Sequence, residues 1–350
     1  MFIGNSYAFP SSILYFSIVH ITNTQNISTS QPFQQMLNVS YSLYKGYAAS
    51  NFQNVEFFYS NGTIIPSWLE GYNYSRNAIY WLKIGSIPAS SSITIYIGFA
   101  LNSTNLFNNK TTGEAPQLSS TYAEYDDGAN IFLAYFNGDT PTSDFNLGTG
   151  VSMTQVTGVT MPNRNTGNVL EFSNSNGEPD SSSDWFAYAF KTALPNEDIV
   201  LEAVLNRFPQ PRTTDLSVVS LGDIGTSSYS NAVGVYMGWD SAYFSNAFTS
   251  SGSLNNDINQ QGSQNTNWNY YTMIYIAGSP TFSGFIAPQF YSSTGGYSGS
   301  ATNPIPTSTS NLYMGDYYSN NYAAYYIDYY RARAYPPNGV MPSVSFGSVA

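Results

Sequence analysis

No stretch of useful length carries apolar residues at the 3.6-residue spacing of an amphipathic helix. Short runs rich in Val, Ile, Thr, Tyr and Phe alternate instead with turn residues such as Gly, Asn, Ser and Pro. The chain contains 31 Tyr and 22 Phe, and aromatic and β-branched residues favour strands. The sequence therefore predicts an all-β fold with almost no helix.

A length of 350 residues suits two β-domains, each large enough to bury its own core. We expect a first domain over residues 1–110, a connector over 111–130 and a second domain over 131–350. The first domain reads as a β-sandwich. The second contains many short apolar runs separated by polar loops, which predicts a sandwich of two sheets.

Several pairings within this plan can be predicted. The run Ile13–Thr22 is apolar with weak alternation, which indicates a strand covered on both faces. Asn61-Gly62 predicts a hairpin between the runs at 52–60 and 63–70, because both residues tolerate a positive φ. The runs 78–84 and 93–99 are expected to pair, and residues 249–267 and 292–310 to form long loops.

Charged residues make up only 9% of the chain, and its net charge is −11. A chain with so few basic residues offers no cationic surface for phosphates, which excludes nucleic acid as a partner. No apolar segment approaches the ~20 residues needed to cross a bilayer, so we expect no membrane span.

Cysteine is absent, which we interpret as export in an organism that does not rely on disulfides. We interpret the initial Met as an expression start that replaces a removed signal peptide. Carboxylate ion pairs are lost in strong acid, whereas hydrogen bonds of Tyr, Ser, Asn and Thr persist there. The composition therefore indicates an extracellular location at the surface of a cell, which we expect to be an acidophilic archaeon.

The pattern Asn-x-Ser/Thr, an acceptor for N-glycosylation, is confined to the expected first domain. The rest of the chain is also rich in Asn, Ser and Thr but contains no such sequon. We therefore predict a glycan-coated first domain and a second domain kept free of glycans. The expected sites are Asn26, Asn38, Asn61, Asn73, Asn102 and Asn109.

The first domain resembles an uncharacterised β-domain of large secreted archaeal and bacterial surface proteins. The resemblance covers about 90 residues and rests on the motifs at Asn54–Phe57, Asn61–Thr63, Pro66–Glu70, Trp81–Ile84, Ile87–Ala89 and Ile93–Gly98. Two positions depart from the pattern: Asn54 replaces the usual acid, and Gly98-Phe99 replaces a final Gly-Asn. If that acid has a role in some members of the family, this chain lacks the residue that would perform it.

The second domain resembles the concanavalin A-like, laminin-G-like jelly roll. Three segments carry the resemblance, namely Trp268–Met273, Leu312–Gly315 and Ile327–Arg331. The usual Asn-Gly hairpin between the first two is missing. The resemblance implies surface attachment, display or glycan binding, without identifying a ligand.

Residues for catalysis are sparse, and we predict that the protein is not an enzyme. His20 is the only histidine and lies between two apolar residues, as structural histidines do. A glycosidase needs paired carboxylates on one strand. The candidates do not meet this need. Glu178, Asp180 and Asp184 lie in a polar loop, and Asp126-Asp127 is expected to form a solvated turn. Glu197, Asp198 and Glu202 are closer to a strand, but Glu202 is expected to face solvent.

The sequence offers two further kinds of site, a calcium site and an aromatic platform for a sugar, each supported by few residues. Calcium suits oxygen ligands, and Asp316 and Asp328 are its best-placed candidates; alternatively, Asp328 pairs with Arg331 or Arg333. Trp239 lies in a polar loop and could stack on a sugar ring, whereas Trp81 and Trp268 fall within strands and are expected in the cores.

Three functions remain open from the sequence. The first is a structural or adhesive surface glycoprotein that contacts surface polysaccharide or other surface proteins, and the second is a lectin-like carbohydrate-binding module. The third is a filament subunit that self-associates by strand donation. Ile13, Tyr15, Ser17 and Val19 are the donor residues expected in that case.

Overall fold

The computed structural model divides into two compact units, residues 1–132 with 336–350 and residues 133–335. It describes residues 9–73, 76–108, 110–121, 124–147, 151–161, 166–174, 186–190, 194–195, 197–207, 216–224, 229–237, 241–246, 258–261, 268–279, 281–287, 296–300, 312–316 and 324–350. The division differs from the expected boundaries, because the connector and residues 336–350 both belong to the first unit. The second unit is thus inserted into the first.

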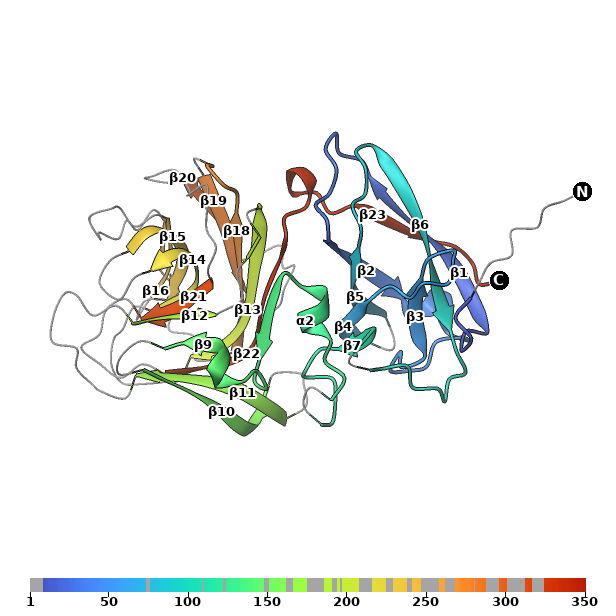
Figure 1. Cartoon of the computed structure of the whole chain (residues 1–350), viewed down its shortest axis with the longest axis horizontal. Helices are drawn as coiled ribbons and strands as arrows, with labels where there is room; N and C mark the ends of the chain where they lie inside the picture. Colours follow the sequence, from blue (N-terminus) through green and yellow to red (C-terminus); the bar gives the residue numbers. More distant parts are fainter. Residues whose placement is uncertain are drawn as a thin grey trace, which may run out of the picture. The chain divides into compact units, whose positions relative to one another are not determined.

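Two four-stranded sheets form the first unit (Figure 1). Sheet A has the order β23 (Ser343–Phe346), β1 (Tyr15–Asn23), β6 (Ser91–Phe99) and β3 (Val55–Phe58). Sheet B has the order β2 (Phe33–Ser40), β5 (Asn77–Ile84), β4 (Ser67–Asn73) and β7 (Thr112–Glu114). Phe57 of sheet A and Tyr80 of sheet B meet edge to face at 5.0 Å, so the sheets share one aromatic core.

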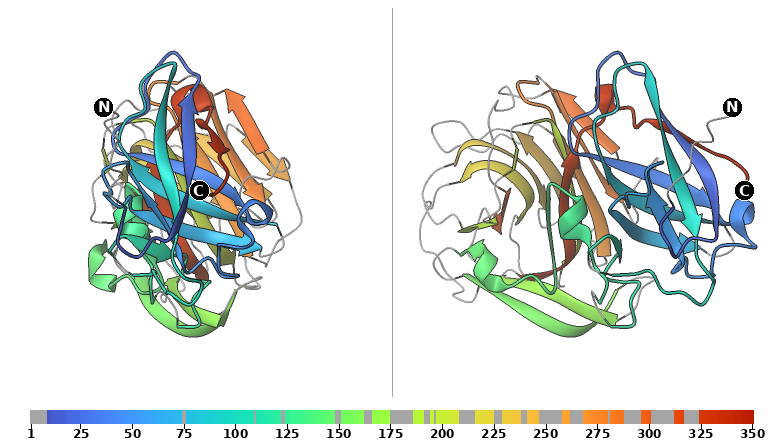
Figure 2. Two further views of the ribbon diagram at one scale, coloured as in Figure 1. Left: turned by 90° about the vertical axis from the view of Figure 1, so that its right-hand side faces the viewer. Right: turned by 45° about the vertical axis from the view of Figure 1, so that its right-hand side comes forward.

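Strand β1 occupies an interior position in sheet A. It pairs antiparallel with β6 on one side and with the C-terminal β23 on the other, as Figure 2 shows. Ser17, Val19 and Ile21 are buried, whereas Tyr15, Ile18 and His20 are exposed. The expectation of a strand covered on both faces is therefore wrong: one face of β1 packs on the core and the other meets solvent.

The chain changes sheet more often than the sequence indicates. The turn at Asn61-Gly62 forms as predicted, with Gly62 at φ 81°, but the hairpin extends only to the bridge between Phe58 and Ile64. Pro66 has no N–H to continue the ladder, and the chain then crosses to sheet B. The expected pairing of 78–84 with 93–99 is wrong, because β5 and β6 lie in different sheets.

Residues 111–132 form part of the first unit rather than a linker. Strand β7 pairs in parallel with β4, and the short helix α2 (Gly128–Ile131) follows it. The ring of Phe132 then packs against two indoles: its centroid lies 5.3 Å from that of Trp68 and 5.9 Å from that of Trp81. The core of the first unit thus holds the segment at its beginning, through β7, and at its end, through Phe132. The other described α-helix, α1 (Tyr41–Tyr44), is equally short, in agreement with the prediction of little helix.

The second unit is a jelly-roll sandwich of two larger sheets, sheet C and sheet D. Sheet C runs from β10 (Val151–Thr160) through β11 (Thr166–Asn174), β22 (Ala324–Ala334), β13 (Ile199–Arg207), β18 (Trp268–Tyr275) and β19 (Thr281–Ala287) to β20 (Gly296–Ser300), and β8 (Ala134–Asn137) also pairs with β22. Sheet D runs from β17 (Ile258–Gln261) through β16 (Ser241–Asn246), β15 (Tyr229–Met237), β14 (Leu216–Ile224), β21 (Leu312–Asp316) and β12 (Phe186–Phe190) to β9 (Phe145–Asn146). All these pairs are antiparallel.

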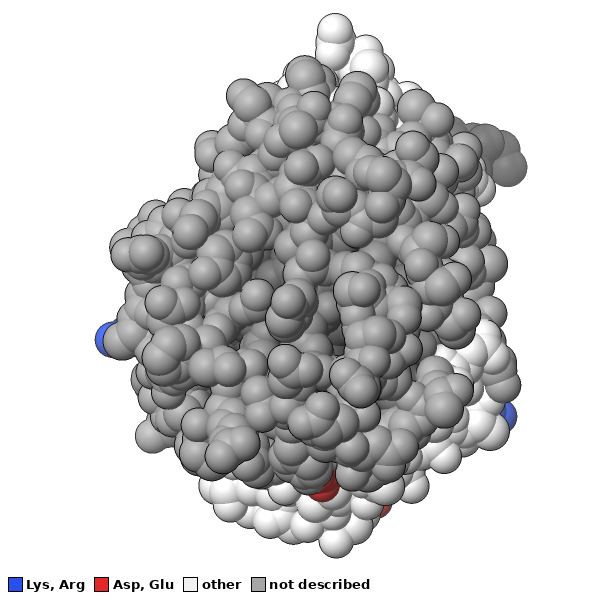
Figure 3. Space-filling view, turned by 90° about the vertical axis from the view of Figure 1, so that its left-hand side faces the viewer, with Lys and Arg blue, Asp and Glu red and all other residues white. Residues whose placement is uncertain are grey.

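The sequence prediction of an all-β chain with a sandwich followed by a jelly roll is confirmed. The three segments that carried the jelly-roll resemblance form β18, β21 and β22. The expected loops at 249–267 and 292–310 each contain a short strand, β17 and β20 respectively. On the face drawn in Figure 3, the described residues are mostly uncharged, in keeping with the composition.

Candidate functional site

An open pocket of about 400 Å³ lies at one end of the first unit. Tyr15 and Tyr47 form an edge-to-face pair at 5.0 Å on one side. Leu101, which is 61% exposed, contributes an apolar wall. The remaining lining residues are Gly46, Ala100, Asn102 and Ser103. Aromatic and aliphatic surface beside an amide and a hydroxyl suits a ligand with both apolar and hydroxyl-bearing faces, such as a sugar ring.

Asn54 ties the two loops of this pocket together. Its buried Nδ2 donates to the carbonyl oxygens of Tyr47 at 2.8 Å and Ala100 at 2.7 Å, and its Oδ1 accepts from Ala49 N–H at 2.7 Å. The same Nδ2 lies 3.3 Å from Asn102 Oδ1. Since one fully buried amide satisfies groups on both loops, the pocket walls are fixed relative to each other.

The described sequon asparagines lie on the surface of the first unit. Five of the six are described, and all five are exposed; Asn109 lies outside the described residues. Exposure of the acceptor asparagine is a requirement for carrying a bulky glycan on a folded domain. The exposed five are Asn26, Asn38, Asn61, Asn73 and Asn102.

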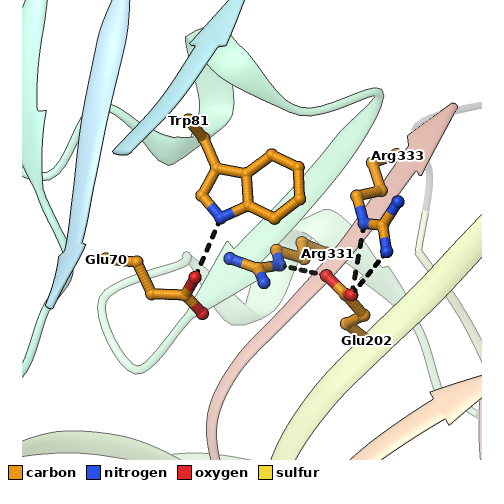
Figure 4. A network of polar contacts seen from close by, with 5 residues as sticks. All are labelled: Glu70, Trp81, Glu202, Arg331 and Arg333. Carbon is orange, nitrogen blue, oxygen red and sulfur yellow. Dashed lines mark hydrogen bonds and ion pairs between the residues drawn. The ribbon is translucent and has the colours of Figure 1, made fainter. Parts of the chain in front are cut away.

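Several carboxylates pack around strands β4 and β7. Glu70 Oε2 accepts from Trp81 Nε1 at 2.9 Å, as Figure 4 shows, and Asp126 Oδ1 accepts from Trp68 Nε1 at 2.7 Å. Asp127 is only 1% exposed, and Asn130 donates to its Oδ1. The expectation that Asp126-Asp127 forms a solvated turn is therefore wrong, because this turn is folded against the indoles of sheet B.

Burial shifts the proton affinity of three acids in the first unit. It raises the pKa of Glu114 to about 7, with the charges of Glu124 and Asp126 adding to the effect while a hydrogen bond from Ser119 opposes it. Burial also raises the pKa of Asp127 to about 6 and that of Glu56 to about 6. All three groups therefore favour the neutral form, which is the form that an acidic medium supplies.

Glu202 lies in the interior of the second unit, which overturns its expected exposure. Arg331 Nε lies 2.6 Å from its Oε2, and Arg333 Nη2 lies 2.9 Å from its Oε1 (Figure 4). Burial alone would raise the pKa of Glu202, but the two guanidiniums outweigh it and hold that pKa below its usual value. Alternation misled the prediction because both faces of β13 are buried.

The other predicted site residues are placed as follows. Asp328 is fully buried in β22, and Asp316 ends β21 with its side chain outside the described part. Trp239 and the loop acids Glu178, Asp180 and Asp184 lie outside the described residues. Within the described ranges, no three His, Asp or Glu side chains are grouped so that they could hold a metal ion. The calcium and Trp239 assignments remain predictions.

The histidine and the tryptophans follow the predictions more closely. His20 is exposed on β1, and its Nδ1 lies 3.1 Å from Oγ1 of Thr94, the residue opposite it on β6. Trp81 is fully buried and Trp268 is 8% exposed, which confirms both as core residues. Among the described helices, none has the length and apolarity to cross a membrane.

Residues 51–140 match a family model described as a domain of unknown function, DUF2341. This match covers the motifs that resemble the uncharacterised β-domain. Over 336 residues the chain is 37% identical to uncharacterized protein 562 of Sulfolobus islandicus rod-shaped virus 1. The alignment covers 93% of this chain but 58% of the viral protein, so the chain spans little more than half of that relative.

Solved structures resemble part of the chain at low identity. A protein of unknown function from Shewanella oneidensis MR-1 is 14% identical, covering 59% of this chain and 87% of that one with a TM-score of 0.38. A carbohydrate esterase of the Shiga toxin-encoding bacteriophage phi24B is 9% identical; the alignment covers 58% of this chain and 98% of the esterase, with a TM-score of 0.39. Lectin I from Ulex europaeus is 10% identical; the alignment covers 57% of this chain and 98% of the lectin, with a TM-score of 0.34.

Proposed function

We propose that this chain is an extracellular structural or adhesive glycoprotein that acts by display and contact rather than by turnover. One observation carries the proposal: every described sequon asparagine is exposed, and all six sequons belong to the first unit. Neutral glycans on this unit would coat its surface without adding charge, while the jelly roll stays uncoated and available for contact.

The acid chemistry of the first unit supports a location outside the cell in an acidic medium. Glu56, Glu114 and Asp127 are buried with raised pKa values, so their neutral forms suit the folded state. A relative in a virus named after Sulfolobus islandicus is compatible with a place on an exposed surface, either of a cell or of a particle.

Electron microscopy with labelled antibodies tests the proposal on material from the native source at its native pH. We expect label on the outer surface of cells or particles. Label confined to the cell interior would contradict the proposal. Regular labelled filaments would indicate the polymeric form of a structural role, with β1 as the strand to examine, and isolated particles would indicate an adhesive form.

The filament alternative would reuse contacts seen within one chain. Strand β1, which contains the predicted donor residues Tyr15, Ser17 and Val19, pairs on both sides within its own sheet, and Ile13 precedes it. Donation between copies would have to exchange this strand, because its position in the sheet is already filled.

A further inference from the structure

The pocket beside Tyr15 and Tyr47 includes a sequon in its lining. Asn102 and Ser103 line it, and Thr104 completes the motif Asn-x-Thr. No other described sequon asparagine lines this pocket. A glycan attached to Asn102 would therefore start at the rim of an aromatic pocket on its own protein.

The orientation of the Asn102 amide favours attachment. Its Oδ1 lies 3.3 Å from Asn54 Nδ2, while its backbone carbonyl accepts from Gln53 Nε2 at 3.1 Å. These contacts hold the oxygen side of the residue against the protein. Within the described part of the chain, no hydrogen bond of Asn102 Nδ2 is found, and this nitrogen is the atom to which an N-glycan is bonded.

The pocket has the chemistry to hold a pyranose. Sugar rings have an apolar C–H face that packs against aromatic surface, and their edges carry hydroxyls that need donors and acceptors. Tyr15 is 47% exposed and Leu101 61% exposed, so both have apolar surface that a covering group could remove from water. A Cβ added at Gly46 would meet no heavy atom within 4 Å, so this side of the pocket is open.

From these observations we infer that the N-glycan of Asn102 folds back and seats its first sugar residues in the pocket formed by Tyr15, Tyr47 and Leu101. The glycan would then be a structural part of the first unit as well as a coat. The inference rests on the proposed glycoprotein function, but it names one sequon out of six. At Asn61, by contrast, the side-chain oxygen accepts from Thr63 N–H within its own turn.

Sequon variants that leave the asparagine in place provide the test. Thr104→Ala removes the sequon of Asn102 while keeping Asn102 and its contact with Asn54, and Thr104→Ser preserves the sequon. Thr63→Ala removes the sequon of Asn61 as the matched control. Each variant is produced in a glycosylating host and in a bacterial host without N-glycosylation, and thermal unfolding is measured.

For glycosylated protein we expect Thr104→Ala to lower Tm by about 2 to 4 °C, as loss of roughly 1 kcal/mol would do in a domain of this size, and Thr63→Ala to lower it less. The effect should vanish in the bacterial protein and in a Tyr47→Leu background. An equal effect of both sequon variants, or an effect that persists with Tyr47→Leu, overturns the inference.

Glycopeptide mass spectrometry of protein from the native source tests the seated glycan and the proposed glycoprotein function separately. Modification at other sequons with Asn102 unmodified overturns the seated glycan and leaves the proposed function intact. Absence of modification at all six sequons removes the glycoprotein itself, and the inference falls with it.

Discussion

At the scale of single residues, Asn54 shows what an amide achieves where the resembling β-domain carries an acid. Its Nδ2 donates to two carbonyl oxygens on separate loops and approaches the amide of Asn102. An ionised carboxylate accepts hydrogen bonds and donates none. The departure from the family motif thus matches a position that needs a donor, next to a sequon.

The buried ion network of the second unit gives a residue-scale prediction. Glu202→Gln leaves Arg331 and Arg333 buried with less compensating charge, so we expect a loss of roughly 3 to 5 kcal/mol in the free energy of unfolding. Glu171→Gln on β11, where the side chain is half-buried, serves as the control. Chemical denaturation of both variants is the measurement, and a cost below about 1 kcal/mol for Glu202→Gln would contradict the account.

The raised pKa of Glu114 gives a prediction about pH. The folded state binds this proton more tightly than the unfolded state, so its contribution is fully present below the ordinary pKa of 4.5 and is lost as pH rises to about 7. Glu56 and Asp127 act in the same direction up to about pH 6. We therefore expect the first unit to unfold at a higher temperature at pH 4 than at pH 8.

Glu114→Gln should remove part of this dependence. The neutral amide cannot ionise, so we expect a gain on the order of 2 kcal/mol at pH 8 and little change at pH 4. Calorimetry at the two pH values measures the difference. Equal effects at both pH values would show that the substitution acts through packing rather than through ionisation.

The Glu202 network has the opposite dependence. Its lowered pKa means that its contribution is present above the ordinary value of 4.5 and is lost as pH falls through the folded-state pKa. Acid therefore favours the first unit through three neutral carboxyls, whereas protonation of Glu202 weakens the second unit.

At the scale of elements, close packing decides how β7 meets the segment that follows it. A Cβ on Gly113 would lie 2.3 Å from Asp127 Cβ and 2.6 Å from Tyr125 O, which the backbone can relieve only by moving. We expect Gly113→Ala to destabilise the unit by roughly 3 kcal/mol. Gly71→Ala, in the neighbouring strand β4 with nothing within 4 Å, should change stability by about 0.5 kcal/mol or less.

Urea unfolding of the two glycine variants measures this contrast. Similar stabilities would show that residues 125–127 do not pack against β7 as described. Because Asp127 has a buried carboxyl, Gly113→Ala should also weaken the pH dependence of the first unit, which provides a second readout.

The strands themselves could be predicted from sequence, but their partners could not. The alternation at Ile93, Ile95 and Ile97 identifies β6, yet its partners are β1, near the start of the chain, and β3, rather than β5. Periodicity reports which face of a strand is apolar and contains no information about the sheet that it joins. The pocket escaped prediction for the same reason, since residues from positions 15, 46–47 and 100–103 form it.

The ionic core of the second unit could not be predicted from alternation, because β13 is buried on both faces. Glu202 lies directly opposite Arg331 in the register of β13 and β22, where a cross-strand pair would be expected once the pairing is known. The sequon positions, in contrast, needed no pairing information, because the tripeptide pattern is read directly from the sequence; the five described sequon asparagines are exposed, including Asn38 within strand β2.

At the scale of the whole molecule, the first unit depends on both ends of the chain. Residues 336–350 return to it, where β23 pairs with β1 and Gln35 Nε2 donates to Pro342 O at 3.1 Å. Removal of this C-terminal segment would expose the edge of β1 and leave the buried amide of Gln35 with one bond fewer.

Hydrogen exchange of the truncated protein tests this dependence. We expect amides of β1 that face β23 to lose at least about tenfold in protection, whereas amides of β13 in the second unit keep theirs. Unchanged protection of β1 would contradict the paired arrangement of the two ends.

We propose an exported protein whose glycans are confined to one unit. Glycopeptide mass spectrometry of protein recovered from outside native cells tests this proposal most directly. We predict modification within Asn26–Asn109 and none in residues 133–335. An unmodified chain, or glycans spread over the second unit, would contradict the account.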